Sequence, residues 1–196
     1  MLRPLLSLSA SCALALLACS HAGTAPPAAA PLAGTFTFGT EAGTEESLDA
    51  LLAKSRYSVF LFFTADCPVQ KAHDARMRAT VAKYAPQGVA FYAVASETGI
   101  DIAAERAEAK RRAIDMPLLE DKNAVFADAL KVEYSTHVVL FEPSRAIRYS
   151  GAEDSERVHL TPSGTLHLDR ALDAVLAGKE PPVTTAEPLG CPLRKH

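Results

Sequence analysis

The sequence of 196 residues lacks any excess of basic residues and any long apolar run. Its 20 lysines and arginines stand against 23 acidic residues, which gives a formal net charge of −3 and argues against a nucleic-acid partner. No uninterrupted apolar stretch reaches the roughly 20 residues that a helix needs to cross a bilayer. With 48% apolar and 22% charged residues, the composition is that of a soluble chain with one hydrophobic core.

The N-terminal residues have the pattern of a secretory signal peptide. Arg3 precedes the apolar residues 14–17, and the segment ends in small residues. Serines interrupt the apolar stretch 5–18, which therefore reads as a leader that is removed and not as an anchor. The alternative to a lipoprotein is a cut by a general signal peptidase nearby, after Ala28 or Ala30, which would discard both Cys12 and Cys19.

Residues 16–20, Leu-Leu-Ala-Cys-Ser, resemble a bacterial lipobox. The resemblance implies a signal peptide over 1–18 and a lipid on Cys19. It places the protein in the cell envelope, facing the periplasm, and Ser20 favours the outer membrane. Residues 19–40, rich in alanine, proline and glycine, are predicted to form a lipid-anchored flexible linker.

The remaining sequence predicts alternating strands and helices. Residues 58–64 form an unbroken apolar run typical of a buried central strand, and Pro68 then opens an amphipathic helix. The segments expected after this helix are a strand at 89–94, a helix at 101–114, a short segment at 118–119, a helix at 123–130, strands at 137–141 and 146–150, and a helix at 167–177. Right-handed crossovers make the first two strands parallel, and a short turn makes the last two antiparallel. This order predicts a thioredoxin-like α/β fold over 41–180, with a central mixed sheet flanked by helices.

Two cysteines remain once the leader and Cys19 are set aside. Cys67 and Cys191, in the tail 181–196, lie 124 positions apart and are candidates for one disulfide, either catalytic or permanent. Cys67 lies where a strand ends and a helix begins, so nearby amides and the helix dipole favour its thiolate. Asp66 opposes this effect. We expect an accessible sulfur at this position.

Four segments carry a resemblance to a known family. They are Phe-Thr-Ala-Asp-Cys-Pro-Val-Gln at 63–70, Tyr-Ala-Pro-Gln-Gly-Val-Ala-Phe at 84–91, the segment 171–179, and Gly-Cys-Pro-Leu at 190–193. Together they resemble the redoxin (peroxiredoxin or AhpC/TSA-like) branch of the thioredoxin-like superfamily, in its bacterial Asp-Cys-Pro type with a C-terminal Gly-Cys tail. The resemblance implies a thiol-disulfide oxidoreductase with Cys67 as nucleophile and Cys191 as resolving thiol, and it implies no cofactor.

The sequence also departs from the superfamily pattern. Gln70 replaces the second cysteine of a thioredoxin, and Thr136 aligns with its cis-proline. Thr64 keeps the threonine-to-cysteine spacing of peroxiredoxins, but residues 134–137 contain no counterpart of their activating arginine. The resemblance therefore implies at most weak thiol peroxidase activity.

Three functions remain open. The first is the oxidoreductase, whose partners would be a disulfide-containing protein or a peroxide and a thiol electron donor. The second is a non-catalytic binding or scaffolding lipoprotein with a permanent disulfide between Cys67 and Cys191. The third is a copper-binding assembly factor, in which His137 would lie near the ligand position but Lys71 replaces the second cysteine. His73 is interpreted as a packing histidine or, less simply, a catalytic base.

Overall fold

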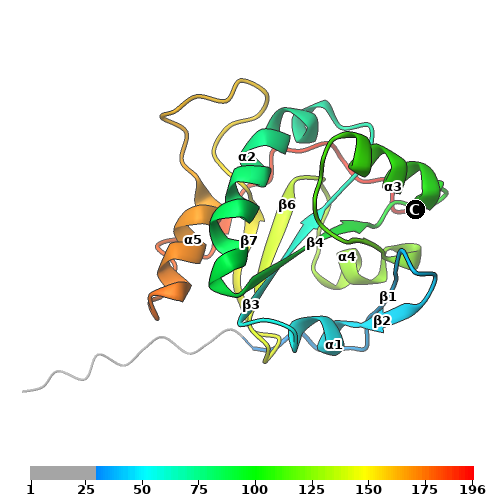
Figure 1. Ribbon diagram of the computed structural model, residues 1–196, viewed down its shortest axis with the longest axis horizontal. Helices are drawn as coiled ribbons and strands as arrows, with labels where there is room; N and C mark the ends of the chain where they lie inside the picture. The colour runs from blue at the N-terminus through cyan, green and yellow to red at the C-terminus, as the bar shows by residue number, and fades with distance from the viewer. Residues whose placement is uncertain (1–29) are drawn as a thin grey trace, which may run out of the picture.

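A computed structural model describes residues 30–196 (Figure 1). The elements in chain order are β1 (Thr37–Gly39), β2 (Glu45–Ser47), α1 (Leu48–Leu52), β3 (Tyr57–Phe62), α2 (Pro68–Tyr84), a 3-10 turn (Ala85–Gln87), β4 (Val89–Ala95), α3 (Ile102–Arg111), β5 (Leu118–Glu120), a second 3-10 turn (Lys122–Ala124), α4 (Val125–Ala129), β6 (His137–Phe141), β7 (Ile147–Ala152), α5 (His167–Leu176) and β8 (Thr185–Ala186). The predicted signal peptide over 1–18 and the predicted lipidation of Cys19 lie outside the described residues. Within them, no helix has the length and apolar character to cross a membrane.

The strands form one mixed sheet in the order β2-β1-β5-β4-β3-β6-β7-β8. Strand β3 pairs parallel with β4 and antiparallel with β6, and β6 and β7 form an antiparallel hairpin. The predicted parallel pairing of β3 with β4 and the predicted antiparallel hairpin of β6 and β7 are confirmed. Because β3 lies between β4 and β6, all six of its residues are buried, which explains why its sequence is continuously apolar.

Helices cover both faces of the sheet (Figure 1). On one face, α2, α3 and α5 pack over residues that include Leu61, Phe91 and Leu140. On the other face, α1 and α4 cover a cluster of aromatic rings around Phe126 and Phe60. The predicted fold class, an α/β thioredoxin-like fold with a central mixed sheet, is therefore confirmed.

Helix α2 begins at the residue that the sequence singled out. Cys67 is its N-cap, with extended backbone angles, and Pro68 occupies the first turn, where its missing N–H is not needed. The helix and its 3-10 extension end at Gly88, whose φ of +85° is in the left-handed region that glycine tolerates. Strand β4 starts at the next residue, so α2 forms the crossover between two parallel strands.

The folded unit begins before residue 41. Phe36 and Phe38, which the sequence analysis assigned to the linker, are buried in the aromatic cluster around Phe126. Strand β1 lies between β2 and β5 in the sheet and pairs with β5 through a single register pair between Gly39 and Glu120. Strand β1 has only three residues and follows a segment rich in alanine and proline. No periodic pattern therefore marked Phe36 and Phe38 as buried.

Candidate redox site

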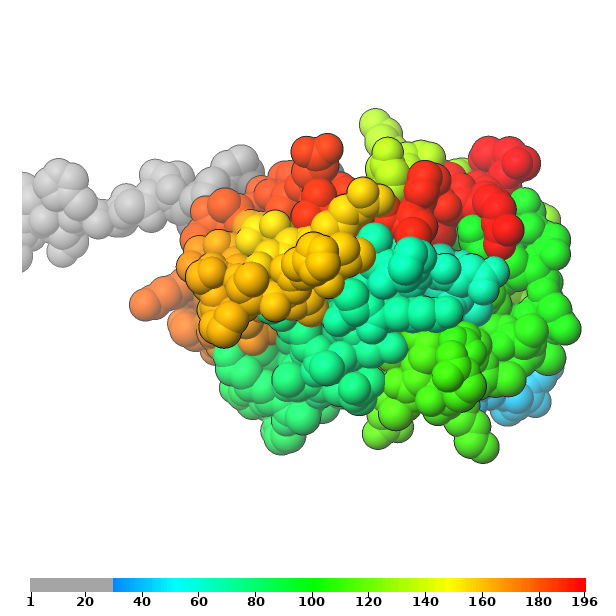
Figure 2. Space-filling view, turned by 90° about the horizontal axis from the view of Figure 1, so that it is seen from above, coloured from blue at the N-terminus to red at the C-terminus, as the bar shows by residue number. Residues whose placement is uncertain are grey.

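A disulfide joins Cys67 to Cys191, with the two α-carbons 5.8 Å apart. Cys67 lies at the carboxyl end of β3, and Cys191 is supplied by the C-terminal segment, which returns across the surface beside the start of α2 (Figure 2). The pairing that the family resemblance implied is present. The disulfide lies at the edge of the sheet where β3 and β4 end and where β6 begins.

The sulfur of Cys67 is buried and not accessible, which corrects the expectation from the sequence. The residue is 1% exposed because the tail covers it, whereas Cys191 is half-buried. The Cys67 sulfur still accepts a hydrogen bond from the backbone N–H of Gln70 at 3.4 Å. The start of the helix therefore offers the amide that would stabilise a thiolate once the disulfide opens.

Gln70, which replaces the second cysteine of a thioredoxin, holds the loop before Cys67. Its side-chain oxygen accepts a hydrogen bond from the backbone N–H of Thr64 at 2.9 Å, and its side-chain nitrogen donates to the carbonyl of Phe62 at 3.1 Å. The residue is 3% exposed, so these contacts satisfy buried polar groups in the turn between β3 and α2. Gln70 thus orients the backbone that presents Cys67.

Side chains from α3 and from the residue after it bind backbone groups of this turn. Arg112 donates to the carbonyls of Thr64 and Ala65 at 3.4 Å each, and its guanidinium pairs with Asp74 of α2. The carboxylate of Glu105 accepts a hydrogen bond from the N–H of Ala65 at 2.8 Å. Burial raises the pKa of Glu105, although the Ala65 bond opposes the shift. Contacts from Gln70, Glu105 and Arg112 therefore hold the turn without any contribution from the tail.

The tail is docked along the segment before β6. Ser135 donates its backbone N–H to the carbonyl of Cys191 at 2.9 Å, and its hydroxyl accepts from the N–H of Cys191 at 3.1 Å. Gly190 approaches so closely that a β-carbon there would lie 1.7 Å from the carbonyl oxygen of Ser135 and 2.7 Å from the hydroxyl of Thr136. A glycine before Cys191 is therefore a steric requirement of this docking.

A buried carboxylate, Glu97, joins the two cysteine segments. It accepts a hydrogen bond from the Thr64 hydroxyl at 2.8 Å and three from Arg194, at 3.0 Å from the backbone and 3.2 Å from two guanidinium nitrogens. Burial alone would raise the pKa of Glu97, but the Arg194 and Thr64 bonds hold it below its ordinary value. The hydroxyl of Thr64 is therefore committed to Glu97 in this state.

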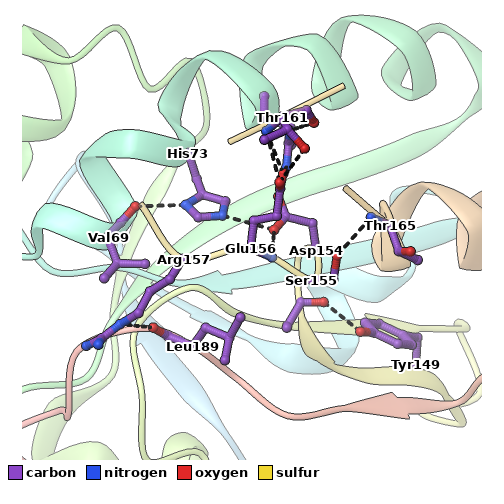
Figure 3. A network of polar contacts seen from close by, with 12 residues as sticks. Val69, His73, Tyr149, Asp154, Ser155, Glu156, Arg157, Thr161, Thr165 and Leu189 are labelled. Atoms are coloured by element: carbon purple, nitrogen blue, oxygen red, sulfur yellow. Dashed lines mark hydrogen bonds and ion pairs between the residues drawn. The ribbon is translucent and has the colours of Figure 1, made fainter. Parts of the chain in front are cut away.

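His73 belongs to a buried polar network between α2 and the loop after β7 (Figure 3). Its Nδ1 contacts the carbonyl of Val69 at 2.8 Å, and its Nε2 contacts Asp154 at 3.2 Å. Asp154 also binds Arg76, and Glu153 beside it is buried with one carboxyl oxygen unpartnered. Both histidine nitrogens are thus engaged, which fits the packing interpretation of His73.

The pKa values in this network are shifted by its burial and its charges. Burial alone would lower the pKa of His73, but the bonds to Asp154 and Val69 and the nearby carboxylates raise it to about 9. Burial raises the pKa of Glu153 to about 8, although His73 and Arg76 oppose the shift. The carboxylates around His73 thus favour its protonated form, and burial favours the protonated form of Glu153.

His137 lies inside the sheet. Its Nε2 contacts the hydroxyl of Ser150 at 2.8 Å, its Nδ1 is buried without a partner, and burial lowers its pKa to about 4. Within 30–196, no group of three or more histidine, cysteine or acidic side chains is arranged to hold a metal ion. In this state the Cys67 sulfur that the suggested copper site would use is bonded to Cys191.

The structure brings Cys67, Cys191 and Thr64 to one place, with Thr64 linked to the tail through Glu97. Sequence reasoning missed Glu97 and Arg194. Glu97 follows the carboxyl end of β4, next to the end of β3, so its place beside Thr64 was accessible from the strand order. The sequence gives no comparable signal for Arg194, because the tail segment that carries it belongs to no strand whose pairing would predict its neighbours.

These features define a class: a thioredoxin-like domain with a disulfide between the start of its first long helix and the C-terminal segment. A model of the AhpC/TSA family matches residues 26–150, which is more than half of the chain. The chain therefore belongs to the AhpC/TSA family. The matched residues include Cys67 but end before Cys191.

Solved structures with the same fold include proteins of unassigned function. A hypothetical protein from Sinorhizobium meliloti is 25% identical, with a TM-score of 0.71 over 85% of this chain and 93% of that chain. An uncharacterized conserved protein from Geobacillus kaustophilus is 22% identical, with a TM-score of 0.74 over 86% and 92%. A secreted disulfide oxidoreductase from Mycobacterium tuberculosis is 18% identical, with a TM-score of 0.51 over 71% and 95%. No curated protein matches the chain significantly.

Proposed function

We propose that this protein is an extracytoplasmic thiol-disulfide oxidoreductase of the redoxin type. The observation that carries the proposal is the disulfide between Cys67, at the start of α2, and Cys191 in the tail. Membership of a redoxin family supports redox chemistry at this pair. The Asp-Cys-Pro turn and the Gly-Cys tail define the subgroup to which we assign the chain.

In the reaction, the Cys67 thiolate attacks one sulfur of a substrate disulfide and releases the other as a thiolate. The Cys191 thiolate then attacks the Cys67 sulfur of the mixed disulfide, which releases the reduced substrate and forms the disulfide between Cys67 and Cys191. Two electrons pass from the protein to the substrate. A thiol electron donor then reduces the protein and becomes a disulfide itself.

A peroxide is the second substrate class at the same site. The Cys67 thiolate would attack the peroxide and become a sulfenic acid with release of an alcohol or water. Cys191 would then condense with the sulfenic acid and release water. Because the hydroxyl of Thr64 is bonded to Glu97, it is not free to hold the peroxide in this state. We therefore propose protein disulfides as the main substrate and peroxide turnover as the weaker activity.

Turnover of insulin disulfides and of hydrogen peroxide tests this proposal. Cys67→Ser should abolish both activities, and Cys191→Ser should accumulate a mixed disulfide on Cys67 that a thiol-blocking reagent preserves for mapping. Arg111→Gln, at an exposed ion pair of α3, is the matched control and should keep the activity. If neither cysteine substitution changes either turnover, the enzyme proposal is wrong.

The second candidate is a non-catalytic binding or scaffolding lipoprotein. The close docking of the tail favours it, since Gly190, Cys191 and Leu193 are held by backbone contacts or burial that do not require turnover. In this case the disulfide would stay oxidised in the folded protein during long incubation with millimolar reduced glutathione, whereas the oxidoreductase would be reduced and reoxidised.

We also propose the location and the arrangement along the chain. Residues 1–18 form the signal peptide, Cys19 carries the lipid in the outer membrane, and the folded domain with its tail faces the periplasm. An oxidising compartment, where disulfides persist, supports this assignment. Labelling with a palmitate analogue tests it: Cys19→Ser should remove the label and Cys12→Ser should not. A label that survives Cys19→Ser would refute the anchor.

A further inference from the structure

A single buried carboxylate contacts both segments that carry the redox cysteines. Thr64 lies three residues before Cys67 and donates its hydroxyl to Glu97 at 2.8 Å. Arg194 lies three residues after Cys191 and donates to the same carboxylate through its backbone and its guanidinium. Glu97 therefore holds the tail against the turn that presents Cys67, independently of the covalent bond.

The charges around Arg194 reinforce this contact. The side chain of Glu97 is only 4% exposed, so its negative charge is removed from water and needs a partner. Arg194 is close enough to Asp66 and Glu105 for their charges to act on it as well. The 69% exposure of the Arg194 side chain limits the strength of its ion pair with Glu97.

Neighbouring contacts align the segment that follows Cys191. The carbonyl of Arg194 accepts a hydrogen bond from the N–H of Thr98 at 2.8 Å, and Leu193 is buried in the aromatic cluster. Lys195, whose side chain is 5% exposed, pairs with Asp128 and Glu133. None of these contacts involves a sulfur atom, so they can hold the segment when the disulfide is open.

We propose that Arg194 is a positioning residue that keeps Cys191 over Cys67 in the reduced protein and thereby sets the equilibrium between dithiol and disulfide. This inference rests on the proposed redox role of the two cysteines. A docked tail raises the effective concentration of one thiol at the other. In the exchange, the dithiol gives two electrons to oxidised glutathione, and the products are the protein disulfide and two reduced glutathione molecules.

The test is redox equilibrium of the full purified chain with glutathione, in which mapping of the disulfide peptides reports the Cys67–Cys191 bond. Arg194→Gln removes the charge and keeps the backbone donor, Glu97→Gln removes the other charge, and the double variant measures their coupling. Arg111→Gln is the matched control, because its ion pair with Glu108 lies on the exposed face of α3. Each equilibrium is measured at low and at high salt.

We expect Arg194→Gln to shift the equilibrium toward the dithiol by about threefold to tenfold at low salt, as a partly exposed charge-assisted contact allows. The double variant should shift little further, high salt should shrink the difference, and the control should match the wild type. Equal equilibria for wild type and Arg194→Gln would overturn the inference and leave the redox pair intact. A wild-type disulfide that excess dithiothreitol cannot reduce in the folded protein would overturn both proposals.

Discussion

At the scale of single residues, the lack of a side chain at Gly190 is as important for the site as the side chains that bind there. Gly190 has no β-carbon, and this lets the tail touch Ser135 and Thr136. The same contact places the tail over Thr136, the position that aligns with the substrate-docking proline of thioredoxins. Under the proposed function, a substrate would therefore have to reach the disulfide from the side of Cys191 or move the tail.

Gly190→Ala should undock the tail. The added methyl group would meet the carbonyl oxygen of Ser135 at 1.7 Å, so the backbone must shift, at an expected cost of about 1 to 3 kcal/mol in the free energy of unfolding. Urea unfolding measures the loss, and the rate of disulfide formation after reduction should fall. Glu187→Ala, at an exposed position of the same tail, is the control and should change neither quantity.

The buried network of His73 and Glu153 predicts a loss of stability at alkaline pH. The folded pKa of His73, about 9, lies above its ordinary 6.5, so its stabilising contribution is complete below pH 6.5 and is lost as the pH rises through 9. The folded pKa of Glu153, about 8, lies above 4.5, so the fold also loses stability as the pH rises from 4.5 to 8. The free energy of unfolding should therefore fall between pH 6.5 and 8.

Urea unfolding across this pH range is the measurement. His73→Gln should flatten the decline, because the substituted side chain does not titrate, whereas the exposed His159→Gln should leave the slope unchanged. The slope, and not the absolute stability, decides the outcome. An equal slope in His73→Gln and the wild type would contradict the assignment.

At the scale of elements, the strand-to-helix turn from β3 to α2 is the centre of the site. The turn is not held by the disulfide alone, since Gln70 satisfies the N–H of Thr64 and the carbonyl of Phe62. Where a thioredoxin has a second cysteine, this chain has a structural amide. The partner of Cys67 must therefore come from outside the helix.

Gln70→Ala should loosen this turn. It leaves the buried N–H of Thr64 without a partner, at a cost of about 1 to 3 kcal/mol, while the carbonyl of Phe62 keeps its hydrogen bond from the N–H of Thr136. We expect a lower unfolding midpoint in urea and faster amide hydrogen exchange at Thr64. Gln87→Ala, whose side chain makes one exposed contact with Lys83, is the matched control. Unchanged exchange at Thr64 would show that Gln70 does not order the turn.

Several of the elements that the sequence patterns predicted have long apolar or amphipathic runs. Strands β3, β4, β6 and β7 and helix α2 have such runs, and their order determined the topology. Strand β1 was missed because it has three residues and follows a segment of alanine and proline. The path of the tail and the roles of Glu97 and Arg194 depend on packing between distant segments, which no local pattern encodes.

At the scale of the whole molecule, the disulfide joins the last part of the chain to its central strand. It closes a loop between residues 124 positions apart, which spans most of the sheet and four of the five α-helices among the residues 30–196. Breaking this loop restores freedom mainly to the unfolded chain.

Removing the disulfide should therefore lower the free energy of unfolding by about 5 kcal/mol in the chain-entropy model. Cys191→Ser compared with the oxidised wild type in guanidinium unfolding measures the difference, and the reduced wild type should match the variant. Far-ultraviolet circular dichroism should stay unchanged in both, since the strands and helices do not include Cys191. A loss below about 1 kcal/mol would contradict the loop-closure account.

The position of Cys191, 124 residues after Cys67, also means that the disulfide can form only after the intervening strands and helices have been synthesised. While the chain emerges from its amino end, Cys67 has no tail to pair with, and its thiol stays available until Gly190 and the residues after it have arrived. A product that stops short of them leaves a reactive sulfur exposed. A thiol-reactive reagent would therefore distinguish copies that lack the tail from copies in which Cys191 has paired with Cys67.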